Sequence, residues 1–255
     1  MRTTLAAAAA LFVATTVTGS AADLAPVYKA APAAAVYSWT GFYIGGNFGG
    51  GMASTRFDDP CFYCSSATPT AGFFTGGAQV GYNYQFGAGL VGIEADVNGN
   101  SAFKESIIGA NDPFAMRVRT QADISGTIRA RGGLVVSNAL IYVTAGAAWA
   151  DVRQTGIEFD NRTNVVNFGA PTGTTANKSG VLWGGVIGAG VEYALSPNWI
   201  IGGEYLHTVY QDRDANIVLA NGNNACNPAQ PANTCVVRSQ LTTDVARLRI
   251  NYKFP

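Results

Sequence analysis

The sequence predicts an all-β protein: an eight-stranded antiparallel up-and-down transmembrane β-barrel with short periplasmic turns and long extracellular loops. Three observations indicate this class. Residues 245–254 alternate strictly between apolar and polar side chains, which is the period of a β-strand. The chain begins with the pattern of a secretion signal. Charged residues make up only 13% of the chain, which suits a barrel whose outer face contacts lipid.

The N-terminal segment predicts export. Arg2 is followed by an apolar run over residues 5–17, and Ser20-Ala21-Ala22 resembles a small-residue cleavage site, so residues 1–22 are expected to be a signal peptide. Residues 23–38 are rich in Ala and Pro and predict an extended periplasmic tether. Residues 39–255 then form the barrel. The whole chain has 16 basic and 16 acidic residues, and loss of Arg2 leaves a charge near −1, so nucleic acid is not an expected partner.

Eight segments carry the strand alternation: residues 39–50, 73–86, 90–98, 123–136, 140–152, 181–193, 199–210 and 245–254. We expect one face of each strand to meet lipid and the other to point into the barrel. In the first four, the expected lipid-facing side chains are Phe42, Ile44 and Phe48; then Phe74, Ala78, Val80, Tyr82, Tyr84 and Phe86; then Val91, Ile93, Ala95 and Val97; then Ile124, Ile128, Ala130, Leu134 and Val136.

The later strands follow the same rule with one exception. The fifth, residues 140–152, is apolar on both faces, so its register is not fixed by the sequence. In the other three, the expected lipid-facing side chains are Val181, Trp183, Ile187, Val191 and Tyr193; then Ile201, Tyr205, His207 and Val209; then Ala246, Leu248, Ile250, Tyr252 and Phe254. An even number of strands closes an antiparallel barrel without free edges.

The connections alternate in length. Those after the second, fourth and sixth strands are short, residues 87–89, 137–139 and 194–198, whereas the others are long and polar. Short periplasmic turns and long extracellular loops are typical of outer-membrane barrels. Both ends of the barrel segment are therefore expected in the periplasm.

Two rival classes are excluded. Residues 134–150 are nearly long enough to cross a bilayer as a helix, but Ser137-Asn138-Ala139 supplies turn chemistry, and residues 181–193 are too short and too rich in glycine. A soluble lipocalin-like barrel would need a charged outer face, and the chain has too few charges to cover one.

Aromatic side chains are expected to form two interface girdles. Trp39 and Trp199 are placed near the periplasmic interface and Trp149 and Trp183 near the outer one, because an indole suits a boundary that is apolar on one side and wet on the other.

Several runs together carry a family resemblance: residues 22–26 (ADLAP), 39–46 (WTGFYIGG), 81–83 (GYN), 188–193 (GAGVEY) and 251–254 (NYKF). The chain resembles the outer-membrane immunogenic protein family, porin-like surface proteins related to the opacity proteins and the OmpA-type barrel. The resemblance implies a barrel in the outer membrane of a Gram-negative bacterium. It also implies insertion by the barrel-assembly machinery, which reads terminal aromatics, here Tyr252 and Phe254.

Inward-facing charges form the clearest candidate site. Two readings stay open: a paired polar core that fills the lumen of an eight-stranded barrel, or a narrow water or ion path gated by salt bridges. Unpaired charges at that depth would be costly, so most are expected to be paired. The expected members are Glu94, Asp96, Asp123, Arg129, Arg131, Glu192, Glu204, Arg247 and Arg249.

The four cysteines fall into two local pairs, Cys61 with Cys64 and Cys226 with Cys235. In an exported protein, two disulfides that staple the first and last outer loops are expected. A redox CxxC site and a four-thiolate metal site are the alternatives. The redox site would lack its usual βαβ setting. The metal site would need a closer spacing than that between Cys226 and Cys235.

No catalytic residue, cofactor or metal is predicted. The single histidine, His207, is expected to face lipid, where it suits an interface residue better than a member of a Ser-His-Asp triad. Haem capture by the outer loops would have to use tyrosines such as Tyr63 and Tyr210.

The expected function is therefore structural, with enzymatic action least favoured. The first hypothesis is a monomeric barrel that contributes to envelope integrity, has outer-membrane lipid as its permanent partner, and displays loops to extracellular or host partners. The alternatives are a small porin passing water, ions or very small solutes, and ligand binding by the loops.

Overall fold

The computed structural model describes residues 37–58, 66–108, 114–160, 171–216 and 236–255. The described part is built from strands: β1 (Gly41–Asp58), β2 (Ser66–Ala67), β3 (Thr70–Phe86), β4 (Gly89–Ile108), β5 (Phe114–Val136), β6 (Ala139–Asp160), β7 (Pro171–Ala194), β8 (Trp199–Tyr210), β9 (Arg213–Asn216) and β10 (Val236–Lys253). Within these ranges, no helix has the length and apolar character needed to cross a membrane. The expected signal peptide and nearly all of the expected tether lie outside the described residues and stay predictions.

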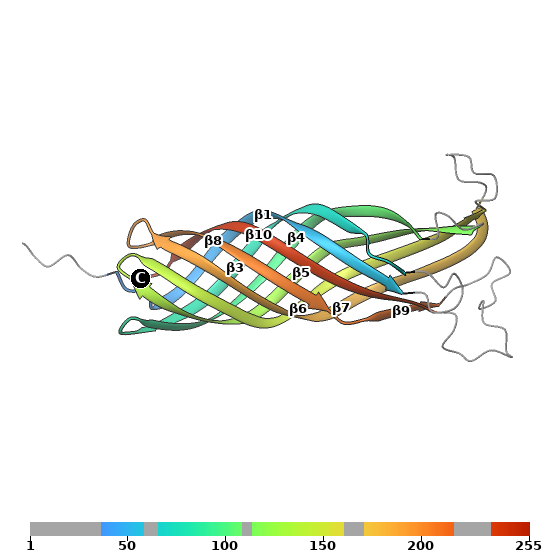
Figure 1. Cartoon of the computed structure of the whole chain (residues 1–255). Helices are drawn as coiled ribbons and strands as arrows, with labels where there is room; N and C mark the ends of the chain where they lie inside the picture. Colours follow the sequence, from blue (N-terminus) through green and yellow to red (C-terminus); the bar gives the residue numbers. More distant parts are fainter. Residues whose placement is uncertain (1–36, 59–65, 109–113, 161–170, 217–235) are drawn as a thin grey trace, which may run out of the picture. The chain divides into compact units, whose positions relative to one another are not determined.

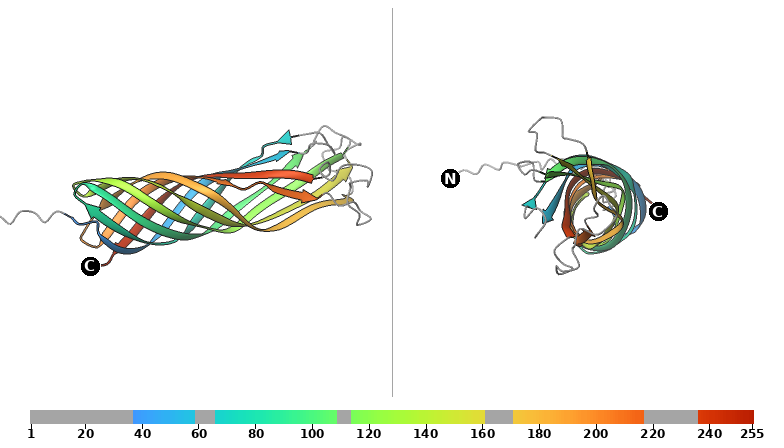
Figure 2. Two further views of the ribbon diagram at one scale, coloured as in Figure 1. Left: turned by 90° about the horizontal axis from the view of Figure 1, so that it is seen from below. Right: turned by 90° about the vertical axis from the view of Figure 1, so that its right-hand side faces the viewer.

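The strands form one closed antiparallel sheet. Their order is β2-β1-β3-β4-β5-β6-β7-β8-β10-β9, and β1 also pairs with β10, so the eight long strands form a barrel with consecutive neighbours (Figure 1). The end-on view in Figure 2 shows the strands as a ring. The eight-stranded up-and-down barrel predicted from the sequence is confirmed.

The two short strands extend their long neighbours. β2 pairs with the outer end of β1 and is separated from β3 by residues 68–69, where Pro69 has no N–H to give to a ladder. β9 continues β8 beyond Gln211 and pairs with the outer part of β10, where Arg213 lies opposite Ser239. The barrel wall is therefore interrupted on two strands near its extracellular side.

The strands run further outward than the sequence predicts. β5, β6 and β7 contain 23, 22 and 24 residues, whereas crossing the membrane as a tilted strand needs about 9–11. Figure 1 shows β6 and β7 continuing well past the end of β8. The outer parts of these strands do not follow the apolar–polar alternation, as in residues 171–180, PTGTTANKSG, so periodicity does not reveal them.

The two faces of the wall follow the predicted alternation. Outward side chains such as Phe42 and Leu248 are 63% and 72% exposed, whereas inward Tyr43 is 1% exposed. The structure also fixes the register of β6, which the sequence left open: Leu140 and Tyr142 point into the barrel, and their neighbours along the strand face outward.

Three register shifts interrupt the strand pairing near the outer end of the described barrel, and one of them lies between Ile157 and Phe159 in the β6–β7 ladder. The other two are bulges that interrupt the alternation. The pairing of β4 with β5 shifts between Gly99 and Ala102, and that of β5 with β6 shifts between Ala122 and Ser125. A bulge adds an unpaired residue and reverses the faces of the residues beyond it. Predictions from strand parity therefore hold only on the periplasmic side of these positions.

Candidate functional site

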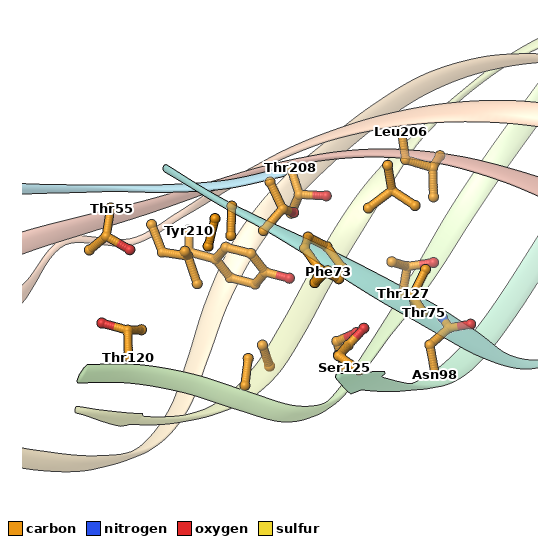
Figure 3. Close-up of a pocket in the computed structure, with 18 of the residues that line it drawn as sticks. Thr55, Phe73, Thr75, Asn98, Thr120, Ser125, Thr127, Leu206, Thr208 and Tyr210 are labelled. Carbon is orange, nitrogen blue, oxygen red and sulfur yellow. The ribbon is translucent and has the colours of Figure 1, made fainter. Parts of the chain in front are cut away.

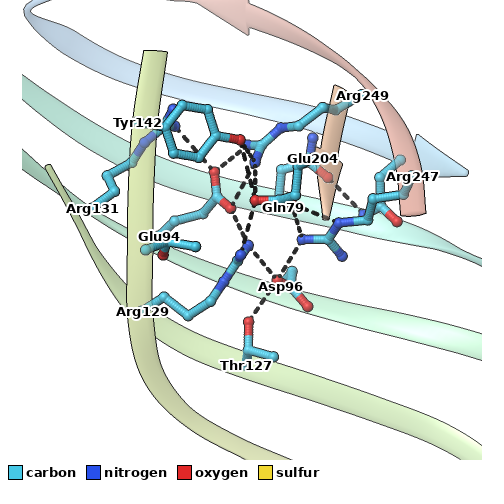
Figure 4. Close-up of polar contacts among 12 residues, drawn as sticks. Gln79, Glu94, Asp96, Thr127, Arg129, Arg131, Tyr142, Glu204, Arg247 and Arg249 are labelled. Atoms are coloured by element: carbon cyan, nitrogen blue, oxygen red, sulfur yellow. Dashed lines mark hydrogen bonds and ion pairs between the residues drawn. The ribbon is translucent and has the colours of Figure 1, made fainter. Parts of the chain in front are cut away.

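Eight inward charges meet inside the barrel. Figure 4 shows the contacts of Glu94, Asp96, Arg129, Arg131, Glu204, Arg247 and Arg249. We call the eight residues the lumen ion cluster. All are at least 95% buried, and four carboxylates balance four guanidinium groups, so the cluster is formally neutral. Its members are Glu94 and Asp96 on β4, Arg129 and Arg131 on β5, Glu192 on β7, Glu204 on β8, and Arg247 and Arg249 on β10.

Arg129 is the central cation of the cluster. Its Nη2 lies 2.5 Å from Glu94 Oε1 and 3.0 Å from Asp96 Oδ2. Its Nη1 lies 2.9 Å from Glu204 Oε2, on the opposite wall. The side chain thus ties β4 and β8 together across the lumen. Breaking such a buried network is costly, because the remaining charges stay buried without their partner.

Arg247 and Arg249 complete the network from β10. Arg247 Nη2 contacts Asp96 Oδ2 at 3.0 Å and Glu204 Oε1 at 2.7 Å. Arg249 contacts Glu94, and its Nε and Nη1 lie 3.2 Å from Glu192 Oε1 and 3.0 Å from Glu204 Oε2. Every carboxylate of the cluster is therefore contacted by at least two guanidinium groups.

Two tyrosines belong to the cluster. Tyr43 donates its hydroxyl to Glu94 Oε2 at 2.6 Å and accepts a hydrogen bond from Arg131 Nη1 at 2.8 Å. Tyr142 donates to Glu204 Oε2 at 3.1 Å. The guanidinium of Arg131 lies 3.9 Å from the centre of the Tyr142 ring, in cation–π geometry. Sequence reasoning missed Tyr142 because the register of its strand was not fixed, whereas the inward parity of Tyr43 was a usable signal.

Inward glycines make room for these rings. A Cβ at Gly81 would lie 2.3 Å from the Tyr43 hydroxyl oxygen, and one at Gly190 would lie 2.5 Å from Tyr142 Cζ. Each ring therefore occupies the space above a glycine of a neighbouring strand.

Amide side chains continue the polar filling toward β1. Gln79 Nε2 donates to Asn251 Oδ1 at 2.8 Å, and Asn47 Nδ2 donates to Gln79 Oε1 at 2.8 Å. Asn251 in turn points to Glu192 Oε1 at 3.4 Å. These contacts join β1, β3 and β10 to the lumen ion cluster.

The prediction that Trp39 belongs to an interface girdle is wrong. Its side chain is fully buried inside the periplasmic mouth, packed with Leu90, Leu140, Ala194 and Ile200; we call this group the periplasmic plug. Trp39 precedes β1, and strand parity does not apply to it.

The chain turns into the mouth at Gly41. Its φ of +141° is a backbone conformation that glycine adopts readily. The Trp39 N–H donates to Gln85 Oε1 at 2.9 Å, which fixes the segment at the foot of β3. The plug therefore sits between the lumen ion cluster and the periplasm.

The other expected girdle residues lie on the outer face. Trp183 and Trp199 are 56% and 47% exposed, and Trp149 is half-buried opposite Trp183 in the β6–β7 ladder. The expected assembly residues also face outward: the Tyr252 ring stacks edge-on between Trp199 and Phe254, at centroid distances of 5.3 and 5.5 Å.

The prediction that Asp123 joins the inward charges is wrong. It lies in the bulge between Ala122 and Ser125, is half-buried, and accepts a hydrogen bond from Gln121. The extra residue of the bulge turns Asp123 away from the face that its strand parity predicts.

His207 lies on the outer face, as predicted, within a polar cluster. Its Nδ1 is 2.7 Å from Asp244 Oδ1, and the Tyr205 hydroxyl donates to the same oxygen at 2.5 Å. Sequence reasoning missed Asp244 because it lies just before the predicted last strand. Tyr210, considered above for haem capture by loops, is instead buried inside the barrel.

Some predicted residues fall outside the described part of the chain. These are the four cysteines, Cys61, Cys64, Cys226 and Cys235, together with Tyr63, so the two disulfides stay predictions. In the ranges that are described, no three or more His, Cys, Asp or Glu side chains are grouped so as to hold a metal ion.

The matching family model and the similar sequences are all of outer-membrane proteins. A family model described as outer membrane protein beta-barrel domain matches residues 24–254. The 31 kDa outer-membrane immunogenic protein of Brucella melitensis is 32% identical over 262 residues, which cover 98% of each chain. The 22 kDa outer membrane protein of Rhizobium leguminosarum is 30% identical and covers 72% of this chain and 70% of its own. The solved structure of Neisserial surface protein A has 14% identity and a TM-score of 0.35, and covers 84% of this chain and 98% of its own.

Proposed function

Because the chain belongs to the outer membrane protein beta-barrel domain family and resides in the outer membrane of a Gram-negative bacterium, we propose that it is a non-conducting barrel that contributes to envelope integrity and displays an extracellular surface to partners. In this proposal the protein is a monomer surrounded by outer-membrane lipid, and the barrel-assembly machinery is its partner during insertion.

One observation carries the proposal: the lumen is filled at two successive levels. The periplasmic plug centres on Trp39, which is 0% exposed. Above it, the eight charges of the lumen ion cluster neutralise one another at distances of about 3 Å, as between Arg131 and Glu192 at 2.9 Å. A path for solutes would have to break both levels. A filled lumen supports a structural role over the porin alternative.

The long outer strands support display. β7 alone has 24 residues, about twice the length that crosses a membrane, so its outer half is available to the surroundings of the cell. Relatives of this chain are named outer-membrane immunogenic proteins. We infer that the extracellular end of this barrel is its contact surface.

Catalysis is not part of the proposal. His207, the one histidine of the chain, is bound to Asp244 on a face that contacts lipid, where a water-soluble substrate does not reach it. Haem capture by Tyr63 together with Tyr210 is not part of it either, because Tyr210 is enclosed in the barrel.

The test is to shorten the outer end without touching the lumen. Val152 pairs with Gly180 across the β6–β7 ladder, so residues 153–179 can be replaced by an Asn-Gly turn that keeps the register. In cells that lack the native copy, this variant is expected to fold, by its heat-dependent shift in electrophoresis, and to restore vancomycin exclusion as the full chain does. It is expected to lose binding of antibodies raised against intact cells.

The matched control replaces residues 161–170 by a Gly/Ser stretch of the same length, which keeps both strands. If the shortened variant folds but fails to restore the barrier, the separation of an anchoring barrel from a displayed surface is wrong. If it keeps full antibody binding, the β6–β7 extension is not the displayed surface.

A further inference from the structure

A second internal feature lies in the outer half of the lumen, beyond the ion cluster. It is a cavity of about 90 Å³, which we call the outer lumen cavity (Figure 3). Asp96 and Arg247 of the ion cluster are among its lining residues, and the other cluster members lie behind them, so the cluster forms its floor. Hydroxyl and amide side chains, aromatic rings and aliphatic side chains line its wall.

Several polar atoms at this cavity have no hydrogen-bond partner among the described residues. Arg247 uses Nε and Nη2 for Glu204 and Asp96, which leaves Nη1 without an acceptor among the described residues. The hydroxyls of Thr75 and Thr208 likewise make no hydrogen bond within the described ranges, although each residue is only 5% exposed. These donors are therefore available to a molecule inside the cavity.

One part of the wall is apolar. Leu206 and Leu241 are each 5% exposed and belong to a packed cluster with Tyr210. In Figure 3, the Tyr210 ring projects between Thr55 and Phe73. An occupant thus meets hydrogen-bonding groups together with a hydrocarbon surface, which is the usual composition of a small-molecule site.

Charge and size restrict the occupant. The floor belongs to a cluster in which four positive charges balance four negative ones, so a charged occupant would leave a net buried charge, which is unfavourable. A cavity of about 90 Å³ holds roughly six to nine water molecules at about 10–15 Å³ of cavity volume for each, so it has room for a small organic compound.

We propose that the outer lumen cavity binds small uncharged amphipathic compounds, with a hydroxyl or carbonyl oxygen on Arg247 Nη1 and Thr208, and a short branched hydrocarbon body against Leu206 and Leu241. The inference goes beyond the structural role, because a closed lumen can hold a ligand without conducting it.

Three probes with one carbon skeleton test the charge requirement: 2-methylpropan-1-ol, 2-methylpropanoate and protonated 2-methylpropan-1-amine. Each is titrated into the full chain in lipid nanodiscs, with methyl NMR signals of Leu206 and Leu241 as the readout. Leu248, which is 72% exposed on the lipid face, reports partition into lipid. The alcohol is expected to shift the methyl signals of Leu206 and Leu241 until they saturate. The two ions are expected to leave these signals unchanged.

Two variants locate the binding. Thr208→Val keeps the shape of the side chain and removes its hydroxyl. It is expected to lower the affinity for the alcohol about five- to tenfold, the effect of one hydrogen bond. Ala150→Leu places a larger side chain at a lining position and is expected to abolish saturation. Shifts that are linear and equal at Leu248, shifts unchanged in both variants, or equal response to the ions would each overturn the proposal.

Discussion

The periplasmic and outer halves of the barrel interior are built differently. In the periplasmic half, the plug and the lumen ion cluster fill the space, and nearly every charge there has two or more partners, as Glu204 has with Arg129, Arg247 and Arg249. In the outer half, threonines and leucines are among the residues that line the outer lumen cavity, and the described wall is broken by three register shifts and two interrupted strands. The difference indicates that stability is concentrated in the periplasmic half, where the lumen is closed.

The largest expected effect is at the centre of the ion cluster. Arg129→Ala leaves Glu94, Asp96 and Glu204 buried with fewer partners, and is expected to lower the free energy of unfolding by about 3–5 kcal/mol. Urea unfolding in phospholipid vesicles, followed by electrophoretic mobility, measures it. Arg238→Ala is the control, because its pair with Asp214 is exposed on both sides and is worth about 0–1 kcal/mol. Equal unfolding midpoints for the two variants would refute the concentration of stability in the cluster.

The next effect belongs to the periplasmic plug. Trp39→Ala removes a fully buried indole and is expected to cost about 3 kcal/mol, as for other large-to-small changes in a core. Trp199→Ala, on the lipid face at 47% exposure, is expected to cost less in the same assay. Brominated lipids provide a second measurement: a chain whose one tryptophan is Trp39 should be quenched less than one that keeps Trp199. Stronger quenching of Trp39 than of Trp199 would show that Trp39 contacts lipid as a girdle residue.

A smaller effect is expected where an aromatic ring packs over an inward-facing glycine. Gly81→Ala forces Tyr43 off its position over β3 and disturbs its bonds to Glu94 and Arg131, at a cost of about 1–3 kcal/mol. Gly185→Ala is the matched control, since its Cβ would meet nothing within 4 Å. The account of ring packing fails if the two alanine variants unfold at the same urea concentration.

The smallest effect is expected at the bulge. Asp123→Asn changes a half-buried carboxylate outside the ion cluster and is expected to shift stability by less than about 0.5 kcal/mol. Asp96→Asn, which removes a charge from Arg129 and Arg247, is expected to destabilise clearly more. A larger loss at Asp123 than at Asp96 would mean that the bulge does not turn Asp123 out of the network.

The same contrast explains what the sequence could predict. Strand parity placed all eight members of the lumen ion cluster correctly on the inner face, because on the periplasmic side of the bulges alternation is strict. They are Glu94, Asp96, Arg129, Arg131, Glu192, Glu204, Arg247 and Arg249. Strand parity could not place Asp123, since a bulge leaves no sign in apolar–polar periodicity.

Three other features were hidden from the sequence. Trp39 lies before β1, where the turn at Gly41 and not strand parity decides its direction. Tyr142 lies in a strand that is apolar on both faces, so only its neighbours in the folded sheet show that it points inward. The outer extensions of β5 to β7 lie beyond the lipid band, where no apolar face is required.

Single-channel recording tests the central claim, a closed lumen, most directly. The refolded chain, confirmed as inserted by its electrophoretic shift, is placed in a planar bilayer beside Trp39→Ala and Arg129→Ala. We predict no conductance steps from the native chain, because the periplasmic plug and the lumen ion cluster close the barrel in series. Stable steps from the native chain that change with Arg129→Ala would contradict the account and identify the ion cluster as a gate in a small porin.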